Sequence, residues 1–239
     1  MSLRALHIVN EPSGPGGLFL PPLESRGFVI DSVDTAQEAL PDTLAGYDAV
    51  ISCGGTANTH ENDIYPWIDP QIELLRGALD DGVPVIGLCL GAQLLTKAAG
   101  GNVYRCEPSE VGWVEVHTNG AAAADPVLGG VPESFMAMQW HRYACELPPG
   151  AVELGRNSTC LQAFRLGEAA WGTQFHIEVT REILLEWARW GGEDLARSGY
   201  TQERYMEELE RHLGRHQEIG RDMAERFADI AATRARSAA

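Results

Sequence analysis

Two kinds of apolar periodicity alternate along the first hundred residues of the chain. Runs that are apolar on both faces predict strands of a parallel sheet, because helices cover such strands on both sides. Segments in which apolar residues recur every three or four positions predict helices that bury one face. The predicted strands are 4–9, 28–32, 47–53 and 83–88, and the predicted helices are 18–26, 66–80 and 90–99. This alternation predicts an α/β fold with a flavodoxin-like, mostly parallel central sheet and helices on both faces.

The pattern changes in the second half of the chain. Short strand-like runs at 111–117, 135–140, 160–166 and 169–177 are separated by turn-rich stretches, and we expect them to be extra or antiparallel strands. From Thr180 onward the periodicity is helical and no strand is predicted. We therefore predict one domain over residues 1–180 and a helical C-terminal extension over residues 181–239 that packs on it.

The charge balance excludes several classes of partner. The 239 residues contain 34 Asp and Glu against 18 Lys and Arg, a formal net charge of −16. A chain this acidic repels phosphate backbones and anionic lipids, so we expect no nucleic-acid partner. No apolar run approaches the roughly 20 residues of a membrane span, and the first residues lack a signal-peptide layout. We expect a cytoplasmic protein with no membrane partner.

Cysteine and lysine usage limits the possible cofactors. The cysteines are odd in number and no pair has C-x-x-C spacing, which argues against a disulfide framework and a zinc site. Lys97 is the only lysine, and its neighbours Thr96 and Ala98 exclude a Walker-A phosphate loop. We expect neither a metal nor a cofactor.

The strongest chemical signal is the segment 87–91, Gly-Leu-Cys-Leu-Gly, in which a buried strand runs directly into a helix. This is the nucleophile-elbow pattern with Cys89 in the position of the serine. Such a tight turn requires small residues two before and two after the nucleophile, as Gly87 and Gly91 are. The helix dipole favours the thiolate, and the N–H of Leu90 points to the same place as an oxyanion donor. The alternative is a buried structural cysteine in a glycine-flanked turn.

A second segment, Gly172 to Glu178, supplies a base and an acid. On a strand, alternate residues share a face, so His176 and Glu178 are expected to point the same way. A glutamate beside the imidazole can orient it, which predicts a Cys-His-Glu triad with Cys89. Taken alone, the segment is better explained as an ordinary strand-end histidine with a surface glutamate; the elbow is what favours the triad.

Together these segments resemble the class I (triad) glutamine amidotransferases. The elbow G-L-C-L-G-A-Q and the later Q-F-H-I-E carry the resemblance, which extends over residues 45–180. It includes the Gly54-Gly55 turn, the segment 110–113 and Trp140-His141. The most similar branch is the GMP-synthase-glutaminase-like branch of short stand-alone proteins.

The resemblance implies a glutaminase half-reaction. Cys89 would attack the side-chain carboxamide of glutamine, and His176 would pass the thiol proton to the leaving ammonia. Glu178 would fix the imidazole, and a γ-glutamyl thioester would form and be hydrolysed.

The resemblance also assigns residues around the substrate. It implies oxyanion donors at Leu90 and Gly55, and it places Gln93 in the glutamine-binding position. In the related branch, a His-x-Asp segment supplies a carboxylate for the α-amino group of glutamine. This chain instead has His141-Arg142-Tyr143 at these substrate-binding positions, which leaves a γ-glutamyl peptide or another amide open as the substrate.

Several functions are compatible with these signals. The first is a glutaminase unit that supplies ammonia to an acceptor, such as a synthetase, on a separate chain. The second is a stand-alone γ-glutamyl hydrolase or peptidase. A catalytically silent regulatory subunit is disfavoured by the intact Cys89-His176-Glu178 set. An α/β-hydrolase with a cysteine elbow is disfavoured because the acid follows the histidine instead of preceding it.

Overall fold

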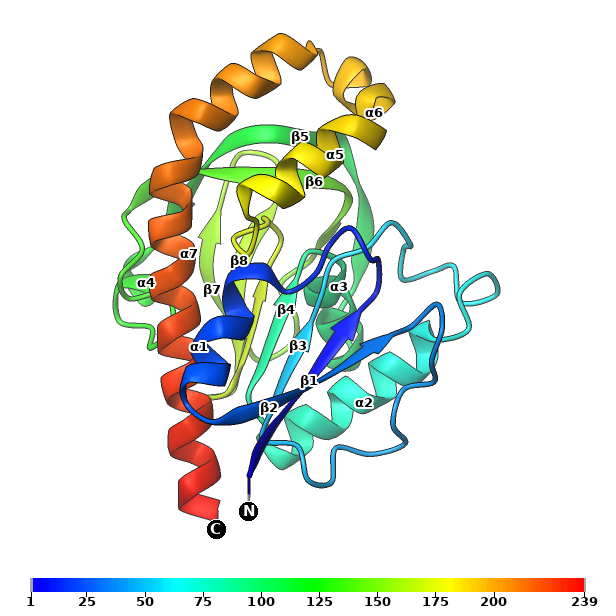
Figure 1. Cartoon of the computed structure of the whole chain (residues 1–239), viewed down its shortest axis with the longest axis vertical. Helices are drawn as coiled ribbons and strands as arrows, with labels where there is room; N and C mark the ends of the chain where they lie inside the picture. The colour runs from blue at the N-terminus through cyan, green and yellow to red at the C-terminus, as the bar shows by residue number, and fades with distance from the viewer. Residues whose placement is uncertain (1, 239) are drawn as a thin grey trace.

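The protein is built on one nine-stranded sheet, half parallel and half antiparallel. The computed structural model describes residues 2–238 (Figure 1). The strand order is β2-β1-β3-β4-β9-β8-β7-β5-β6; the first five strands are parallel to their neighbours and the remaining pairs are antiparallel. The strands are β1 (Leu3–Val9), β2 (Phe28–Asp34), β3 (Ala49–Ser52), β4 (Val85–Leu88), β5 (Val103–Thr118), β6 (Ser134–Cys145), β7 (Ala151–Arg156), β8 (Leu161–Leu166) and β9 (Ala170–Thr173). The predicted α/β fold is confirmed.

Helices cover both faces of the parallel half, and further helices pack against the antiparallel half. The helices are η1 (Gly17–Phe19), α1 (Leu20–Ser25), α2 (Ile68–Asp81), α3 (Leu90–Ala98), α4 (Gly120–Ala123), α5 (Arg181–Trp190), α6 (Gly192–Arg197) and α7 (Gln202–Ala238). Successive strand residues enter opposite layers: Ile51 and Ile86 lie in the cluster that includes α1 and α7, whereas Val50 and Val85 lie in the cluster that includes α2 and α3. Within the described chain, none of the helices combines the length and apolar composition needed to cross a membrane.

Helix α7 runs the full length of the molecule and lies beside α1 (Figure 1). Its second half buries residues three and four apart, among them Met223 and Phe227, in the same cluster as the sheet. Its first half buries Tyr205, Leu209 and Leu213 against Trp113 and α5. The helices predicted after Thr180 are therefore present, and α7 shares the core of the sheet. A domain boundary at residue 180 stays a prediction.

Two strand predictions need correction. The strand predicted over 169–177 ends at Thr173, and the segment 174–180 that carries His176 and Glu178 is irregular. Beyond Thr173 this segment no longer pairs with β4 or β8, and only isolated bonds hold it, such as His176 N–H to the carbonyl of Met138 at 2.9 Å. Strand β7 was not predicted, because its short sequence contains Gly155, where its pairing with β8 shifts register.

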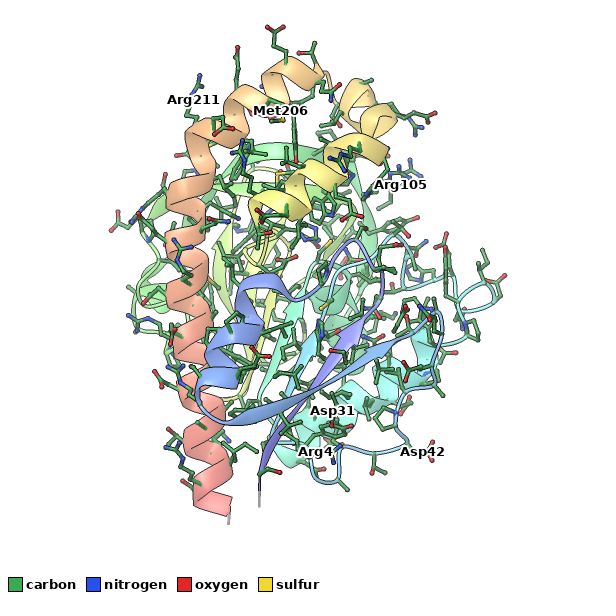
Figure 2. The ribbon with its side chains drawn as sticks, viewed as in Figure 1. Arg4, Asp31, Asp42, Arg105, Met206 and Arg211 are labelled. Carbon is green, nitrogen blue, oxygen red and sulfur yellow. The ribbon has the colours of Figure 1, made fainter. Side chains whose placement is uncertain are left out.

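Ion pairs contribute little to this frame. Arg4 of β1 and Asp31 of β2 lie together at the edge of the sheet, with Nε to Oδ2 at 3.0 Å (Figure 2). The two side chains are 42% and 31% exposed. Pairs of this kind contribute at most about 1 kcal/mol, so the stability of the sheet comes mainly from its two buried layers.

The turn from β4 into α3 is the tightest point of the fold. Cys89 lies there with φ 51° and ψ −104°, the one positive φ of a non-glycine residue in the part of the chain that the structure describes. A Cβ on Gly91 would lie 1.9 Å from the carbonyl oxygen of Ser52, and one on Gly87 would lie 2.7 Å from the carbonyl group of Gly91. The need for small residues on both sides of Cys89 is therefore confirmed, and its cause is contact with the backbone of β3 and α3.

We predict that Gly91→Ala lowers the free energy of unfolding by at least about 2 kcal/mol, because the methyl group cannot avoid the Ser52 carbonyl without moving the backbone. Gly77→Ala is the matched control: a Cβ at this helical position meets nothing within 4 Å, and the change should stabilise α2 by about 0.5 kcal/mol. Urea unfolding of both variants measures the difference. Equal stabilities would show that the close approach at Gly91 is not a constraint.

Candidate active site

A cavity of about 480 Å³ opens at the carboxyl ends of the parallel strands, the usual place for a ligand in an open α/β sheet. The loop after β3 supplies Gly54 and Gly55, the turn after β4 supplies Cys89, and the segment after β9 supplies His176. Every residue predicted for the site except Glu178 lines this cavity: Gly55, Cys89, Leu90, Gln93, His141, Arg142, Tyr143 and His176. Glu178 lies behind His176, away from the cavity wall.

The His176–Glu178 pair is buried and closely bonded. Nδ1 of His176 lies 2.7 Å from Oε1 of Glu178, and the two residues are 4% and 1% exposed. Nε2 is therefore the ring nitrogen left for the cavity. The two side chains face each other although the segment is not a strand, because its backbone still alternates: Phe175 and Ile177 point into the core on the opposite side.

Electrostatics keeps His176 protonated. Burial by itself lowers the pKa of His176, but its interactions with Glu178 and Cys89 outweigh that effect and raise the pKa to about 10. The second carboxylate oxygen of Glu178 has no hydrogen-bond partner among the described residues. The positive charge of the His176 ring is therefore the main interaction that offsets the cost of burying the Glu178 carboxylate.

Cys89 is held among polar groups in the cavity floor. Nε2 of Gln174 lies 3.6 Å from its sulfur, and the sulfur lies 4.0 Å from the carbonyl oxygen of Trp140. The ring of Trp187 packs edge-on against the His176 ring, with centroids 4.7 Å apart, and its indole N–H donates to the carbonyl of Ser13 at 2.8 Å. These contacts restrict how the thiol and the imidazole can turn.

Leu90 and Gly55, the two residues expected to supply oxyanion donors, lie close to each other in the cavity wall. Leu90 is the first residue of α3, where an N–H has no partner within its own helix. The Cβ that Gly55 lacks would lie 3.1 Å from Cδ2 of Leu90, so the two residues are close neighbours. Both line the cavity.

The predicted substrate-binding residues already make contacts within the protein. Gln93 donates from Nε2 to the carbonyl of Tyr143 at 2.8 Å and to Oε1 of Gln174 at 3.3 Å. Arg142 is 57% exposed and pairs with Asp194 of α6 at 2.5 Å. Tyr143 is half-buried, and its ring lies 6.5 Å from that of His60. Only Arg142 among them presents a largely exposed charge at the cavity.

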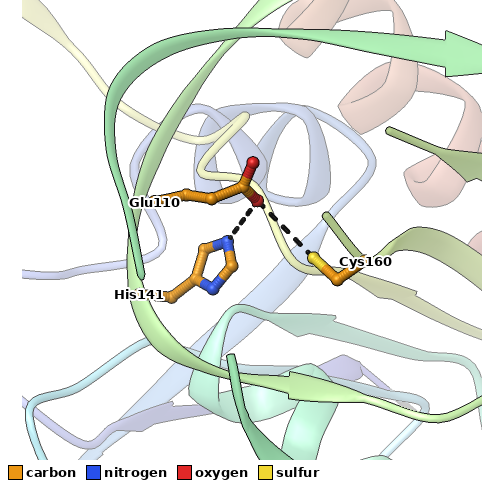
Figure 3. A group of neighbouring side chains, drawn as sticks. All are labelled: Glu110, His141 and Cys160. Atoms are coloured by element: carbon orange, nitrogen blue, oxygen red, sulfur yellow. Dashed lines mark hydrogen bonds and ion pairs between the residues drawn. The ribbon is translucent and has the colours of Figure 1, made fainter. Parts of the chain in front are cut away.

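His141 belongs to a buried cluster with Glu110 and Cys160 (Figure 3). Its Nε2 lies 3.0 Å from Oε2 of Glu110, and the Cys160 sulfur lies 3.5 Å from the same oxygen. These side chains are metal-capable, but Gln162 and Asn157 also donate to Glu110, at 2.8 and 2.7 Å. Hydrogen bonds therefore account for both carboxylate oxygens, and the cluster serves to fix the cavity wall.

Sequence reasoning did not single out Gln174, Trp187 or the Glu110–His141 pair as site contacts. Gln174 lies within the Q-F-H-I-E segment, so its proximity to the motif was the available signal. Trp187 reaches the site from α5, and Glu110 contacts His141 across paired strands β5 and β6. No pattern within a short stretch of the sequence predicts such contacts.

The chain is similar to known amidotransferases in sequence. Residues 23–183 match the family model described as glutamine amidotransferase class-I. The chain is 28% identical over 187 residues to the glutamine amidotransferase-like protein YfeJ of Salmonella typhimurium, covering 76% of this chain and 78% of that protein. It is 35% identical over 129 residues to one of the subunits of the glutamine-hydrolysing GMP synthase of Pyrococcus abyssi, covering 51% of this chain and 67% of that one.

Another relative and a solved structure extend the comparison. The chain is 30% identical over 148 residues to a γ-glutamyl-L-1-hydroxyisopropylamide hydrolase of a Pseudomonas species, covering 57% of this chain and 49% of that protein. The crystal structure of a glutamine amidotransferase from Thermotoga maritima superposes with a TM-score of 0.84 at 26% identity, over 95% of this chain and 99% of that chain. Since the family model covers more than half of the chain and the folds agree over nearly its whole length, this chain belongs to the class I glutamine amidotransferase family.

Proposed function

We propose that the protein hydrolyses the side-chain amide of glutamine or of a γ-glutamyl compound through a thioester on Cys89. The observation that carries the proposal is the shared cavity: a strained, glycine-flanked Cys89 faces a histidine whose Nδ1 is held at 2.7 Å by a buried glutamate. A structural cysteine would need neither the positive φ nor the ion pair beside it.

The proposed reaction uses the triad in two steps. The Cys89 thiolate attacks the amide carbon, and the N–H groups of Leu90 and Gly55 stabilise the oxyanion that forms. The His176 imidazolium gives its proton to the leaving nitrogen, the C–N bond breaks, and ammonia or an amine departs from a γ-glutamyl thioester. Water then attacks the thioester, His176 accepts a proton from it, and the acid product leaves as the thiolate re-forms. Glu178 holds the imidazole ring throughout and stabilises its charge.

A second candidate, a γ-glutamyl hydrolase acting on larger amides, is favoured by the aromatic part of the cavity wall. Three tryptophans line it: Trp140, Trp187 and Trp190, the last 47% exposed. Their rings suit an apolar amine portion beyond the scissile bond. Tyr143 provides no carboxylate for the α-amino group of free glutamine, and the similarity to the Pseudomonas γ-glutamyl amide hydrolase favours the same class.

The partner depends on which substrate is used. A glutaminase unit would pass its ammonia to an acceptor on a separate synthetase chain, and the similarity to one component of a multi-subunit GMP synthase supports that possibility. A γ-glutamyl hydrolase would need no acceptor besides water.

We expect the isolated protein to hydrolyse γ-glutamyl-isopropylamide and γ-glutamyl-p-nitroanilide with a kcat/KM at least about tenfold above that for glutamine, since apolar contacts of this size discriminate by that factor. Trp190→Ala should lower kcat/KM for these amides and leave glutamine hydrolysis within about twofold. Assays of released amine or ammonia give the kcat/KM values of both enzymes for each substrate. A preference for glutamine that Trp190→Ala does not change would favour the glutaminase unit instead.

Cys89→Ala should reduce amide hydrolysis to background, because no other covalent nucleophile is proposed. Cys145→Ala is the matched control: Cys145 is 2% exposed, does not line the cavity, and burial raises the pKa of its thiol to about 12. It should keep kcat within about twofold. Mass spectrometry after a short exposure to iodoacetamide should find Cys89 modified first. Loss of activity in the Cys145 variant with full activity in the Cys89 variant would refute the elbow assignment.

Glu178→Gln should lower kcat by about 10²- to 10⁴-fold, as expected when the orienting acid of a triad is neutralised. Burial lowers the pKa of His176, but Glu178 and Cys89 together raise it to about 10, so removing the charge of Glu178 should lower that pKa. Activity that needs the protonated ring is lost as pH rises through this pKa. The alkaline limb of kcat should therefore move to lower pH by about 1 unit or more. The control is the exposed Glu186→Gln on α5, which should leave both the limb and kcat unchanged.

A further inference from the structure

The segment that carries His176 and Glu178 lacks the strand pairing that would normally fix it. Strand β9 ends at Thr173 and α5 begins at Arg181, so the intervening backbone needs other hydrogen-bond partners. The carbonyl groups of three of its residues, 176, 178 and 179, accept bonds from outside the sheet. Two of these three bonds come from one helix, α7.

His216 of α7 makes the shortest of these bonds. Its Nε2 lies 2.7 Å from the carbonyl oxygen of His176, and the residue is only 1% exposed. A carbonyl accepts and never donates, so Nε2 carries the proton. Burial lowers the pKa of His216, which keeps the ring neutral, and its Nδ1 has no partner among the described residues. The ring is further fixed edge-on against Trp113, with centroids 5.1 Å apart.

Two neighbours on α7 extend the contact along the segment. Nε2 of Gln217 donates to the carbonyl of Val179 at 3.3 Å. One turn on, a Cβ at Gly220 would lie 2.3 Å from the carbonyl oxygen of Ile177, so only glycine lets the helix approach this closely. On the other side, the N–H of Leu18 donates to the carbonyl of Glu178 at 3.0 Å. The segment is held between α7 and η1.

We propose that His216 is a positioning residue for His176 and that α7, through His216 and Gln217, is part of the catalytic apparatus. The inference rests on the proposed function, since it assigns His216 to the same triad. Its physical basis is that an error of about 1 Å in a reacting group can cost about 10²-fold in rate. Without the His216 donor, the buried carbonyl of His176 loses its hydrogen-bond partner. The backbone that carries the His176 ring is then held less firmly in place.

The test compares an apolar and a conservative replacement of His216. His216→Leu keeps the volume but removes the donor, and it should lower kcat by about 10- to 100-fold with KM within about twofold. His216→Gln can donate from a similar position and should recover most of kcat. The matched control is His212→Leu, one turn earlier and also against Trp113 with centroids 5.5 Å apart, which should stay within about twofold of the parent. A folded Leu variant with the parent kcat, or Leu and Gln variants that are equally slow, would overturn the proposal.

A second readout separates this proposal from the hydrolase assignment. The rate of Cys89 alkylation by iodoacetamide at pH 7 needs no substrate and depends on the imidazolium beside the thiolate. It should fall in His216→Leu and recover in His216→Gln even if no amide tested is hydrolysed. If the Leu variant does not fold, as judged by thermal unfolding, the half-buried Gln217→Leu carries the test. Gln217→Leu should slow both alkylation and turnover by about threefold or more, and parent-like values for both would refute a positioning role for α7.

Discussion

The site depends on a steric constraint at one turn. For Cys89 to stand at the end of β4 with its thiol in the cavity, α3 must begin directly at the strand and pass close to the carbonyl of Ser52 on β3. Only glycine at position 91 permits that approach, and the positive φ of Cys89 is the accompanying local strain, a cost of about 1–3 kcal/mol. The buried layers on both faces of the sheet hold the turn in place. Strain at this position is what separates the thiol from an ordinary core cysteine.

The second constraint is electrostatic and lies one strand away. Glu178 is 1% exposed, with one oxygen unpartnered within residues 2–238, a costly environment for a carboxylate. The imidazolium of His176 offsets that cost, and the negative charge of Glu178 in turn keeps the ring protonated. The backbone under this pair is fixed by α7, by η1 and by one bond from the N–H of His176 to Met138 of β6, and not by regular strand pairing.

Local pattern accounts for much of this arrangement. The elbow was predictable because a strand that runs directly into a helix needs small residues on both sides of the nucleophile, although the contact that excludes a Cβ at Gly91 is with Ser52 of β3. The pairing of His176 with Glu178 was also predictable, although the strand invoked for it ends at Thr173. An extended backbone points successive side chains to opposite sides with or without a partner strand. His176 and Glu178 therefore point the same way although their segment is irregular. The apolar runs of β1, β3 and β4 fixed the parallel half of the sheet for the same reason.

Contacts between distant segments that no motif marks could not be predicted. His212 and His216 are one helical turn apart and look equivalent in the sequence, yet His216 is buried against the carbonyl of His176 while His212 is half-buried beside Trp113. Which face of α7 meets the sheet depends on the packing of the whole layer. The α/β class and the candidate nucleophile, base and acid could be predicted from the sequence alone, because each is marked by a pattern within a short segment. Only the tertiary structure decided that the cavity wall is a Glu110–His141 network and that the last helix supports the histidine, because long-range packing selects those partners.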